Sequence, residues 1–205
     1  MKVLLASHNA KKLAELRRLA AGLDLGIEVV GLDDVPPYDE PVEDGDTFVD
    51  NALIKARAGF VVSGLPTLAD DSGIEVDVLN RMPGVRSARW AGPAKDDAAN
   101  NALLLAQIDD VPDERRTGRF VAVVALVCAD GEHVVRGEMP GRIAREERGE
   151  NGFGYDPLFV PDGETRTSAE LSAQEKDAIS HRGKAMRDVI PLLTALEQTE
   201  RRSRW

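Results

Sequence analysis

Two apolar segments in the middle of the chain form the clearest β-hairpin pattern in the sequence. Residues 119–129 contain the apolar run Phe120–Cys128, residues 132–138 follow, and Asp130-Gly131 joins the two segments. An Asp-Gly pair between two strand-like segments is typical of a tight hairpin turn, because both residues accept the backbone angles that such a turn needs. The fold therefore contains at least one antiparallel pair of strands.

Strand and helix patterns alternate on both sides of this hairpin. Further strands are expected at residues 2–6, 27–32, 67–69 and 74–79, and helices at residues 10–21, 47–62 and from Asp96 or Asp97 to about Gln107. Residues 33–46 hold three prolines and seven carboxylates, so they are expected to form a loop, as are the polar residues 70–73 and the Gly-containing segments 82–95 and 149–163. Helices that interleave with strands around a hairpin predict an α/β fold with a mixed sheet.

The C-terminal part contains two helix signals with a break between them. Ser172 and Glu175 have the spacing of a capping box, which predicts a short helix. Lys176 and His181 cannot share one face of a straight helix, because five residues advance about 500° at 3.6 residues per turn. We therefore expect a break near residues 180–183 and a final helix to about Glu197, followed by a charged tail over residues 198–205.

Composition and charge narrow the class of protein. With 205 residues, of which 42% are hydrophobic and 30% charged, the chain is typical of one globular domain, residues 1–205. It shows neither an apolar run of the roughly 20 residues that span a bilayer nor a signal-peptide core, and its single cysteine, Cys128, fits a buried thiol better than a reactive one. We therefore expect a cytoplasmic protein that binds no membrane. A net charge of −10 argues against a partner such as DNA or RNA, but does not concern nucleotides.

The turn between the first strand and the first helix is a candidate phosphate site. It consists of Ser7-His8-Asn9-Ala10-Lys11-Lys12. A helix N-terminus favours anions, and lysines there oppose the helix dipole, so a bound polyphosphate is one reason for their presence. Simple solvation of the lysines is the alternative, since the turn lacks a glycine-rich phosphate loop.

A pair of adjacent carboxylates is the candidate metal site. Asp70-Asp71-Ser72 follows an apolar segment and precedes Gly73. Carboxylates at a strand end can hold a hard cation such as Mg²⁺, although a solvated Asp- and Gly-rich turn is an equally familiar explanation. Glu43 and Asp44, in the acidic loop, are candidates for a second ligand or for mere solvation.

Two later segments are candidates for recognising a base. Gly152-Phe153-Gly154-Tyr155-Asp156-Pro157 combines glycines that allow close approach with rings that can stack on a nucleobase or pack in the core. Ser180-His181-Arg182-Gly183 places two hydrogen-bond donors side by side, with Lys176 nearby. Three histidines without a metal-binding spacing make a zinc site improbable, and no residue is a candidate for covalent catalysis.

Six motifs in order along nearly the whole chain resemble the inosine/xanthosine triphosphate pyrophosphatase family, the deaminated-purine NTP pyrophosphatases. The motifs are Ser7-His8-Asn9-x-x-Lys12; Thr47-Phe48-x-x-Asn51-Ala52 with Lys55-Ala56; Ala69-Asp70-Asp71-Ser72-Gly73; Pro83-Gly84-Val85 through Ser87-Ala88-Arg89; Gly152-Phe153-Gly154-Tyr155-Asp156-Pro157; and Glu175-Lys176 through Ser180-His181-Arg182-Gly183. Each motif is weak alone, and their order and spacing carry the resemblance. Ser7-His8 stands where many members have Thr-Gly.

The resemblance implies a role for each candidate residue. Asp71 would be magnesium ligand and proton acceptor, with Glu43 as second metal ligand and Ser72 contacting substrate. The triphosphate would lie on Ser7, His8, Asn9, Ala10, Lys11 and Lys12, with Lys12 as the main cation. The base would pack against Phe153, Gly154, Tyr155 and Asp156, while Lys176, His181 and Arg182 would meet the 6-oxo purine and the phosphates.

The resemblance also implies an α/β fold of two lobes on a long mixed β-sheet flanked by helices, with a nucleotide cleft between the lobes, and usually a homodimer. The expected reaction is Mg²⁺-dependent hydrolysis of ITP, dITP or XTP to the monophosphate and pyrophosphate, without a covalent intermediate, which would cleanse the nucleotide pool. Two rivals remain: a pyrophosphatase for pyrimidine or modified nucleotides, and a nucleotide-binding regulator without catalysis.

Overall fold

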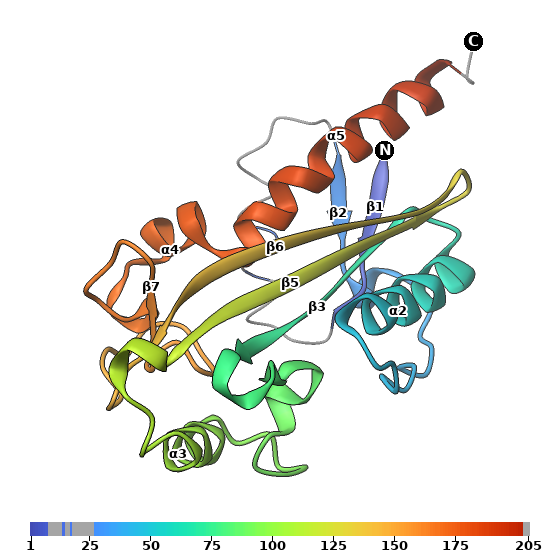
Figure 1. Cartoon of the computed structure of the whole chain (residues 1–205). Helices are drawn as coiled ribbons and strands as arrows, with labels where there is room; N and C mark the ends of the chain where they lie inside the picture. Colours follow the sequence, from blue (N-terminus) through green and yellow to red (C-terminus); the bar gives the residue numbers. More distant parts are fainter. Residues whose placement is uncertain (8–13, 15–16, 18–26, 203–205) are drawn as a thin grey trace. The chain divides into compact units, whose positions relative to one another are not determined.

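A computed structural model describes residues 1–7, 14, 17 and 27–202 and shows a mixed β-sheet with helices (Figure 1). The strands are β1 (Lys2–Leu5), β2 (Glu28–Val30), β3 (Thr67–Val76), β4 (Met82–Pro83), β5 (Thr117–Cys128), β6 (Gly131–Ile143) and β7 (Phe159–Pro161). Their order is β2-β1-β3-β5-β6-β7, with β4 paired to β3. β1 is parallel to β2 and β3, whereas β3–β4 and β6–β7 are antiparallel. The predicted α/β class with a mixed sheet is therefore confirmed.

The described helices correspond to those expected at residues 47–62, from Asp96 or Asp97, after Ser172 and after the break near residues 180–183. They are α2 (Phe48–Ser63), α3 (Asp97–Gln107), α4 (Ala173–Ile179) and α5 (His181–Arg202). The N-cap residues Thr47, Asp96 and Ser172 each accept a hydrogen bond from a backbone N–H in the first helical turn. Gly64, with φ of 66°, ends α2 in the left-handed conformation that glycine adopts most easily. The helix expected at residues 10–21 lies outside the described residues, apart from positions 14 and 17, which are helical.

The expected turn at residues 70–73 is wrong, because β3 runs without interruption from Thr67 to Val76. The acidic residues in this segment are buried within the strand rather than solvated in a turn. Gly73 is explained by packing, since a Cβ atom there would collide with the Ser87 side chain and lie 2.6 Å from the Gly84 carbonyl oxygen. Polar and glycine residues in β3 therefore reflect tertiary neighbours, not a chain reversal.

Other boundaries differ by smaller amounts. The strand expected at residues 27–32 is shorter and is followed by a 3-10 turn, Leu32–Asp34. The hairpin is confirmed, and β5 and β6 extend beyond the expected bounds to form the long pair visible in Figure 1. α5 continues to Arg202, past the predicted end near Glu197, and residues 203–205 lie outside the described part.

The chain divides into two compact units, each with its own apolar core. Unit 1 comprises residues 1–71, 122–136 and 182–205, and unit 2 comprises residues 72–121 and 137–181. The core of unit 1 contains Val3, Leu5, Leu68, Ala122, Val124, Leu126, Ala185, Met186, Val189 and Leu193. The core of unit 2 contains Ile74, Val76, Leu104, Ile108, Phe120, Met139, Ile143, Tyr155, Leu158 and Phe159. Each core is thus assembled from segments that are distant in sequence.

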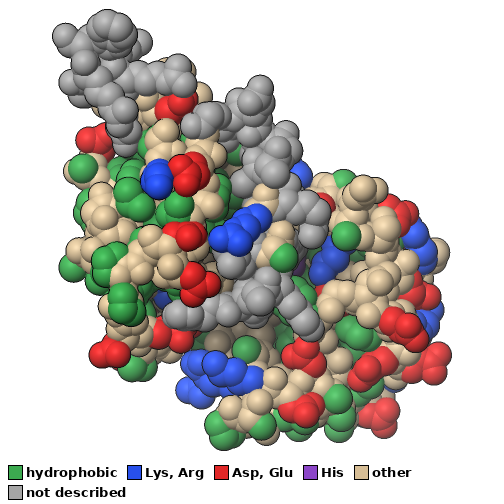
Figure 2. All heavy atoms as spheres, turned by 180° about the vertical axis from the view of Figure 1, so that it is seen from behind, with side chains coloured by type: hydrophobic (Ala, Val, Ile, Leu, Met, Phe, Trp, Pro, Cys, Tyr) green, Lys and Arg blue, Asp and Glu red, His purple; other side chains and the backbone are tan. Residues whose placement is uncertain are grey.

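Surface features agree with the composition. Cys128 is buried, as expected. Among the helices that the structure describes, none combines the length and apolarity needed to cross a membrane. On the face seen in Figure 2, outside the grey atoms, Lys and Arg side chains occur in separate small groups among carboxylates rather than in one stripe.

Candidate functional site

In unit 1, β3 carries two buried carboxylates that are compensated by cations and an amide. Asp70 and Asp71 are 2% and 8% exposed. Asp70 Oδ2 lies 3.4 Å from Nε of Arg182, the second residue of α5, and both side chains are buried. Asp71 Oδ2 accepts a hydrogen bond of 3.1 Å from Asn51 Nδ2, and its Oδ1 lies 3.7 Å from Lys55 Nζ. Buried carboxylates remain ionised only with such partners.

The helix α2 supplies the two groups that contact Asp71. Asn51 and Lys55 are four residues apart, so they project from the same face of this helix. Close packing of α2 is possible because it carries Gly59, where a Cβ atom would lie 2.8 Å from the Thr67 side chain. Asn51 also accepts a hydrogen bond of 2.9 Å from the Gly45 N–H, which connects the acidic loop to this face.

Lys55 connects the predicted ligand Glu43 with Asp71. Its Nζ lies 3.2 Å from Glu43 Oε2 and 3.7 Å from Asp71 Oδ1. Burial alone would lower the pKa of Lys55, but the carboxylates Asp70, Asp71 and Glu43 outweigh burial and raise the pKa above its usual value. The ammonium group is therefore charged at neutral pH, and both predicted metal ligands, Glu43 and Asp71, lie within 4 Å of it.

The chemistry of this cluster fits a magnesium ion that shares its ligands with substrate. Carboxylate oxygens are the protein ligands that Mg²⁺ prefers. Within the described part of the chain, no group of three or more His, Cys, Asp or Glu residues is arranged to hold a metal. Mg²⁺ is commonly bound by one or two carboxylates together with water and substrate phosphates, so Asp71 and Glu43 satisfy the protein share of such a site.

In unit 2, the segment Gly152–Asp156 is held by a buried ion pair. Asp156 is 3% exposed, and its Oδ2 lies 2.6 Å from Lys176 Nζ and accepts a 2.9 Å hydrogen bond from the Phe153 N–H. Lys176 Nζ also lies 5.4 Å from the centroid of the half-buried Phe153 ring. Gly152 has φ of 80°, and a Cβ atom there would collide with the Asp156 carboxylate. Asp156 and Lys176 of α4 therefore stabilise this conformation of the loop.

Tyr155, predicted to contact the base, lies in the apolar core of unit 2. Its hydroxyl donates a hydrogen bond of 2.8 Å to the Ser87 carbonyl oxygen, and burial raises its pKa above the usual value. The structure therefore places this ring on the packing side of the loop. A contact between Tyr155 and a base stays a prediction.

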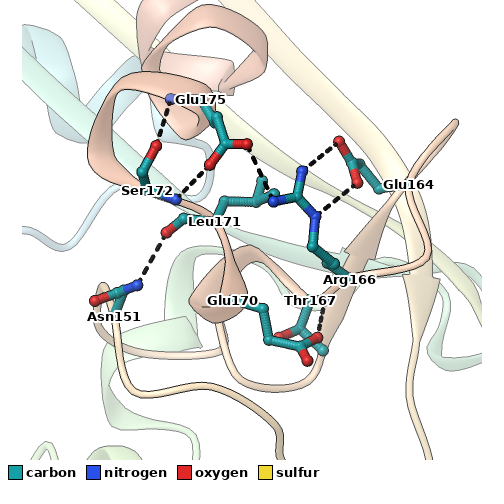
Figure 3. Close-up of polar contacts among 8 residues, drawn as sticks. All are labelled: Asn151, Glu164, Arg166, Thr167, Glu170, Leu171, Ser172 and Glu175. Carbon is teal, nitrogen blue, oxygen red and sulfur yellow. Dashed lines mark hydrogen bonds and ion pairs between the residues drawn. The ribbon is translucent and has the colours of Figure 1, made fainter.

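A surface network fixes the start of α4, the helix that carries Lys176 (Figure 3). Arg166 contacts both carboxylate oxygens of Glu164, at 3.2 and 3.3 Å, and Glu175 Oε1 at 3.0 Å. Glu175 Oε2 accepts the Ser172 N–H at 2.8 Å, while Ser172 Oγ accepts the Glu175 N–H. These bonds, first those from Ser172 and then that from Arg166, lower the pKa of Glu175 to about 2. The predicted capping box is confirmed.

The predicted break between α4 and α5 is present at Ser180, whose extended backbone (φ −65°, ψ 153°) separates the two helices. His181 is buried, and its ring stacks on Phe120 with centroids 5.0 Å apart and planes 12° apart. Arg182 is buried against Asp70, as described above. Both side chains thus have protein partners, and their convergence on one ligand stays a prediction.

The remaining predicted residues are placed as follows. Ser7 is half-buried just after β1, and its N–H donates to the Leu5 carbonyl oxygen at 3.1 Å. Ser72 is half-buried in β3. Gly154 has φ of 63° in the base-recognition loop. His8, Asn9, Ala10, Lys11 and Lys12 lie outside the described residues.

Asn51 and Lys55 belong to one of the six motifs, but the sequence predicted no role for either residue. The available signal was their spacing of four residues in a helix otherwise rich in apolar residues, which indicates one polar position on a packed face. Their partner Asp71 is 20 residues from Asn51 in sequence, so only the structure shows the contact.

Comparison with known proteins identifies the family. A family model described as the Ham1 family matches residues 3–192. A Nocardia farcinica protein named dITP/XTP pyrophosphatase is 63% identical over 203 residues, which cover 97% of this chain and 98% of the relative. A Mycobacterium abscessus crystal structure described as nucleoside-triphosphatase / dITP/XTP pyrophosphatase is 58% identical with a TM-score of 0.77, covering 93% of this chain and all of that one. The Staphylococcus aureus Ham1 protein is 36% identical with a TM-score of 0.83, covering 98% of this chain and all of that one.

These matches extend over almost the whole chain and over both units. The fold of this chain is therefore shared with a solved Ham1 protein, and the family model covers most of its length. The resemblance recognised from the motifs is confirmed, and this chain belongs to the Ham1 family.

Proposed function

We propose that this chain hydrolyses the deaminated purine nucleotides dITP, ITP and XTP to the nucleoside monophosphate and pyrophosphate. It is a nucleoside triphosphate pyrophosphatase, a hydrolase of phosphoanhydride bonds, as the names of relatives at about 60% identity over nearly the full chain support. The observation that carries the proposal is the cluster of the buried Asp71 and Asn51 with the half-buried Lys55 and Glu43 in unit 1. Such a cluster combines a proton acceptor with carboxylate ligands and a charge-balancing cation.

Asp71 is the general base of the proposed mechanism. Its carboxylate takes a proton from the attacking water, and the hydrogen bond from Asn51 Nδ2 to Oδ2 fixes the plane of the carboxylate during this transfer. Asp71 and Glu43 would hold Mg²⁺, which would supply neutralisation of charge on the phosphates. Lys55 balances the negative charge of the two carboxylates, because its ammonium group lies within 4 Å of both. Attack at the phosphorus nearest the ribose releases pyrophosphate.

The triphosphate is bound in this proposal by Ser7 and by the residues from His8 to Lys12. The support is their position after β1 and their family motif, with Lys12 as the main cation. Ser72 contacts the substrate beside Asp71.

Base selection is assigned to residues of the two later motifs. Phe153 offers a stacking surface, and Lys176, His181 and Arg182 supply donors for the purine 6-oxo group and the phosphates. An adenine amino group would face these donors with another donor, which would leave buried groups unpaired at a cost of about 1–3 kcal/mol. The half-buried state of Phe153 supports a stacking role, since part of the ring remains accessible.

The cellular setting is also a proposal. We expect a homodimer in the cytoplasm, and the names of the relatives support a role in removing deaminated nucleotides before they reach nucleic acid synthesis. The absence of nucleic acid partners stays a prediction from the net charge of −10.

A substrate panel with Mg²⁺ tests the function. Release of pyrophosphate and of orthophosphate is followed for ITP, dITP, XTP, ATP, dTTP and UTP, with Asp71→Asn as the inactive variant and the exposed Asp110→Asn as its matched control. We expect pyrophosphate from the first three nucleotides, loss of turnover in Asp71→Asn and wild-type turnover in Asp110→Asn. Preference for dTTP or UTP, or wild-type rates in folded Asp71→Asn, would refute the proposal.

A further inference from the structure

The helix α3 holds the base-recognition loop, Gly152–Asp156, at Gly154. Both the N–H and the carbonyl oxygen of Gly154 bond to side chains of this helix. Asp97 Oδ2 accepts the Gly154 N–H at 2.8 Å, and Asn101 Nδ2 donates to the Gly154 carbonyl oxygen at 3.2 Å. Asp97 and Asn101 are four residues apart, so they lie on one face of the helix, one turn from each other. Gly154 follows Phe153 directly, and fixing its peptide groups fixes the backbone that carries the Phe153 ring.

The two contacts come from different environments. Asp97 is exposed at the first turn of α3, whereas Asn101 is 2% exposed. The Oδ1 atom of Asn101 is buried and accepts no hydrogen bond within the described part of the protein. An apolar side chain would avoid this unsatisfied acceptor, so the amide has to be explained by its donor bond to Gly154.

The conformation of Gly154 depends on these two hydrogen bonds. Its φ of 63° lies in the left-handed region, which glycine adopts without strain, and a Cβ atom there would meet nothing within 4 Å. The Cβ position of Gly154 therefore lies in open space, and the hydrogen bonds to α3 are contacts that hold its peptide groups. On the other side of Phe153, the Phe153 N–H is bound by Asp156.

We infer that Asp97 and Asn101 are positioning residues for base selection: they set the place of the Phe153 ring through Gly154 without touching the nucleotide. This inference rests on the proposed function, in which Phe153 stacks on the base. It predicts that loosening Gly154 lowers discrimination between hypoxanthine and adenine nucleotides more than it lowers stability, because displacement of a group that contacts substrate by about 1 Å can cost about 100-fold in rate.

The chain offers a matched control for each residue. Asp96 is also exposed at the start of α3 and also accepts one backbone N–H at 2.8 Å, but from Ala99 inside the helix. Asn100 is as buried as Asn101, yet its amide bonds to Ala91 N–H and the Ala88 carbonyl oxygen in a different segment. Substitution of a control residue removes side-chain hydrogen bonds of α3 that do not involve Gly154.

The experiment measures kcat/KM for ITP and ATP in Asp97→Ala, Asp97→Asn, Asp96→Ala, Asn101→Ala and Asn100→Ala, with Tm for each. We expect the ITP/ATP ratio to fall about 10- to 100-fold in Asp97→Ala and Asn101→Ala. Asp97→Asn should restore the ratio, since its amide oxygen can accept the Gly154 N–H. The two controls should lower Tm but keep the wild-type ratio.

Hydrogen–deuterium exchange of peptides covering residues 151–158 gives a readout that does not depend on activity. Exchange should accelerate in Asp97→Ala and Asn101→Ala and stay at the wild-type rate in the two controls. Unchanged exchange, or equal losses of selectivity in test and control variants, would overturn the inference. If the wild-type protein does not hydrolyse ITP, the proposed function fails, and unchanged or accelerated exchange still decides whether α3 holds Gly154.

Discussion

At the scale of single residues, Arg182 shows how a candidate specificity residue also supports the fold. Its guanidinium lies 3.4 Å from Asp70, and the side chains are 4% and 1% exposed. Removal of one partner from a buried ion pair leaves an uncompensated charge, which is more costly than the loss of a surface contact. The contact between Arg182 and Asp70 is therefore a buried ion pair and not a surface one.

Arg182→Ala should accordingly lower the free energy of unfolding by about 3–5 kcal/mol, because the buried Asp70 loses the guanidinium beside it. Urea denaturation of the wild type and of the variant measures this loss. The double variant Asp70→Asn/Arg182→Met is the control and should recover much of it, since no buried charge is left alone. Equal stability of wild type and Arg182→Ala would show that the pair does not stabilise the fold.

Because Arg182→Ala also removes the buried ion pair with Asp70, the role of Arg182 in base selection is tested with Arg182→Lys. Arg182→Lys keeps a positive charge beside Asp70 but loses the planar donor geometry of arginine. The ITP/ATP ratio of kcat/KM in this variant separates a donor role from charge compensation.

At the scale of elements, Arg116 ties the end of α3 to the end of β6. It is 1% exposed and donates to three carbonyl oxygens, those of Ile108 (2.5 Å), Ile143 (3.0 Å) and Ala144 (2.9 Å). Burial, with repulsion from Arg145, lowers the pKa of Arg116 from its usual value. A guanidinium with five donors suits this task, because it satisfies carbonyl groups that neither element can satisfy alone.

Arg116→Met should lower the free energy of unfolding by about 3 kcal/mol or more, because buried carbonyl oxygens lose their donors at about 1–3 kcal/mol each. Chemical denaturation measures the change. The adjacent Arg115 is exposed, so Arg115→Met is a matched control and should stay close to wild type. A small effect at both positions would mean that water replaces the lost donor.

The capping box at the start of α4 also stabilises an element, and its contribution to stability depends on pH. The pKa of Glu175 is about 2 in the folded protein, below the 4.5 of an unperturbed glutamate. Ionised Glu175 therefore stabilises the fold above about pH 4.5, and this contribution is lost as the pH falls toward 2.

Glu175→Gln should lower Tm at pH 6 and have a smaller effect at pH 3.5, where the wild-type advantage is already partly lost. Thermal unfolding at the two pH values measures the difference. Glu146 is exposed and makes no hydrogen bond or ion pair within the described residues, so Glu146→Gln is the control. A difference between wild type and Glu175→Gln that is independent of pH would contradict the assignment.

At the scale of the whole molecule, each unit has an apolar core of its own, built from segments far apart in sequence. Because both cores are apolar, we expect the proposed Mg²⁺ to act in the reaction rather than in folding.

EDTA should abolish pyrophosphate release and leave Tm and the circular dichroism spectrum unchanged, because a weakly held ion adds little to the stability of the folded state. Addition of excess Mg²⁺ should restore activity fully. EDTA saturated with Mg²⁺ beforehand is the control for non-specific effects. A drop of Tm in EDTA would indicate a structural metal, and full activity in EDTA would remove the metal from the mechanism.

Local patterns in the sequence were sufficient for most of the elements. The Asp-Gly hairpin, the caps at Thr47, Asp96 and Ser172 and the break at Ser180 follow from interactions between residues at most a few positions apart. The family was also recognisable from the sequence, because its motifs keep their order and spacing. These features depend on contacts between residues that are close in sequence, so they can be predicted from local sequence patterns.

The tertiary structure decided how the charged residues are used. A turn was the expected form of residues 70–73, yet they continue a buried strand because Asp70 meets Arg182, 112 residues away, and Asp71 meets Asn51, 20 residues away. Burial of a carboxylate is costly until a cation or donor reaches it, and local sequence contains no information on which distant side chain does so. For the same reason, the contacts of Gly154 with Asp97 and Asn101 could not be predicted from the sequence and are shown only by the tertiary structure.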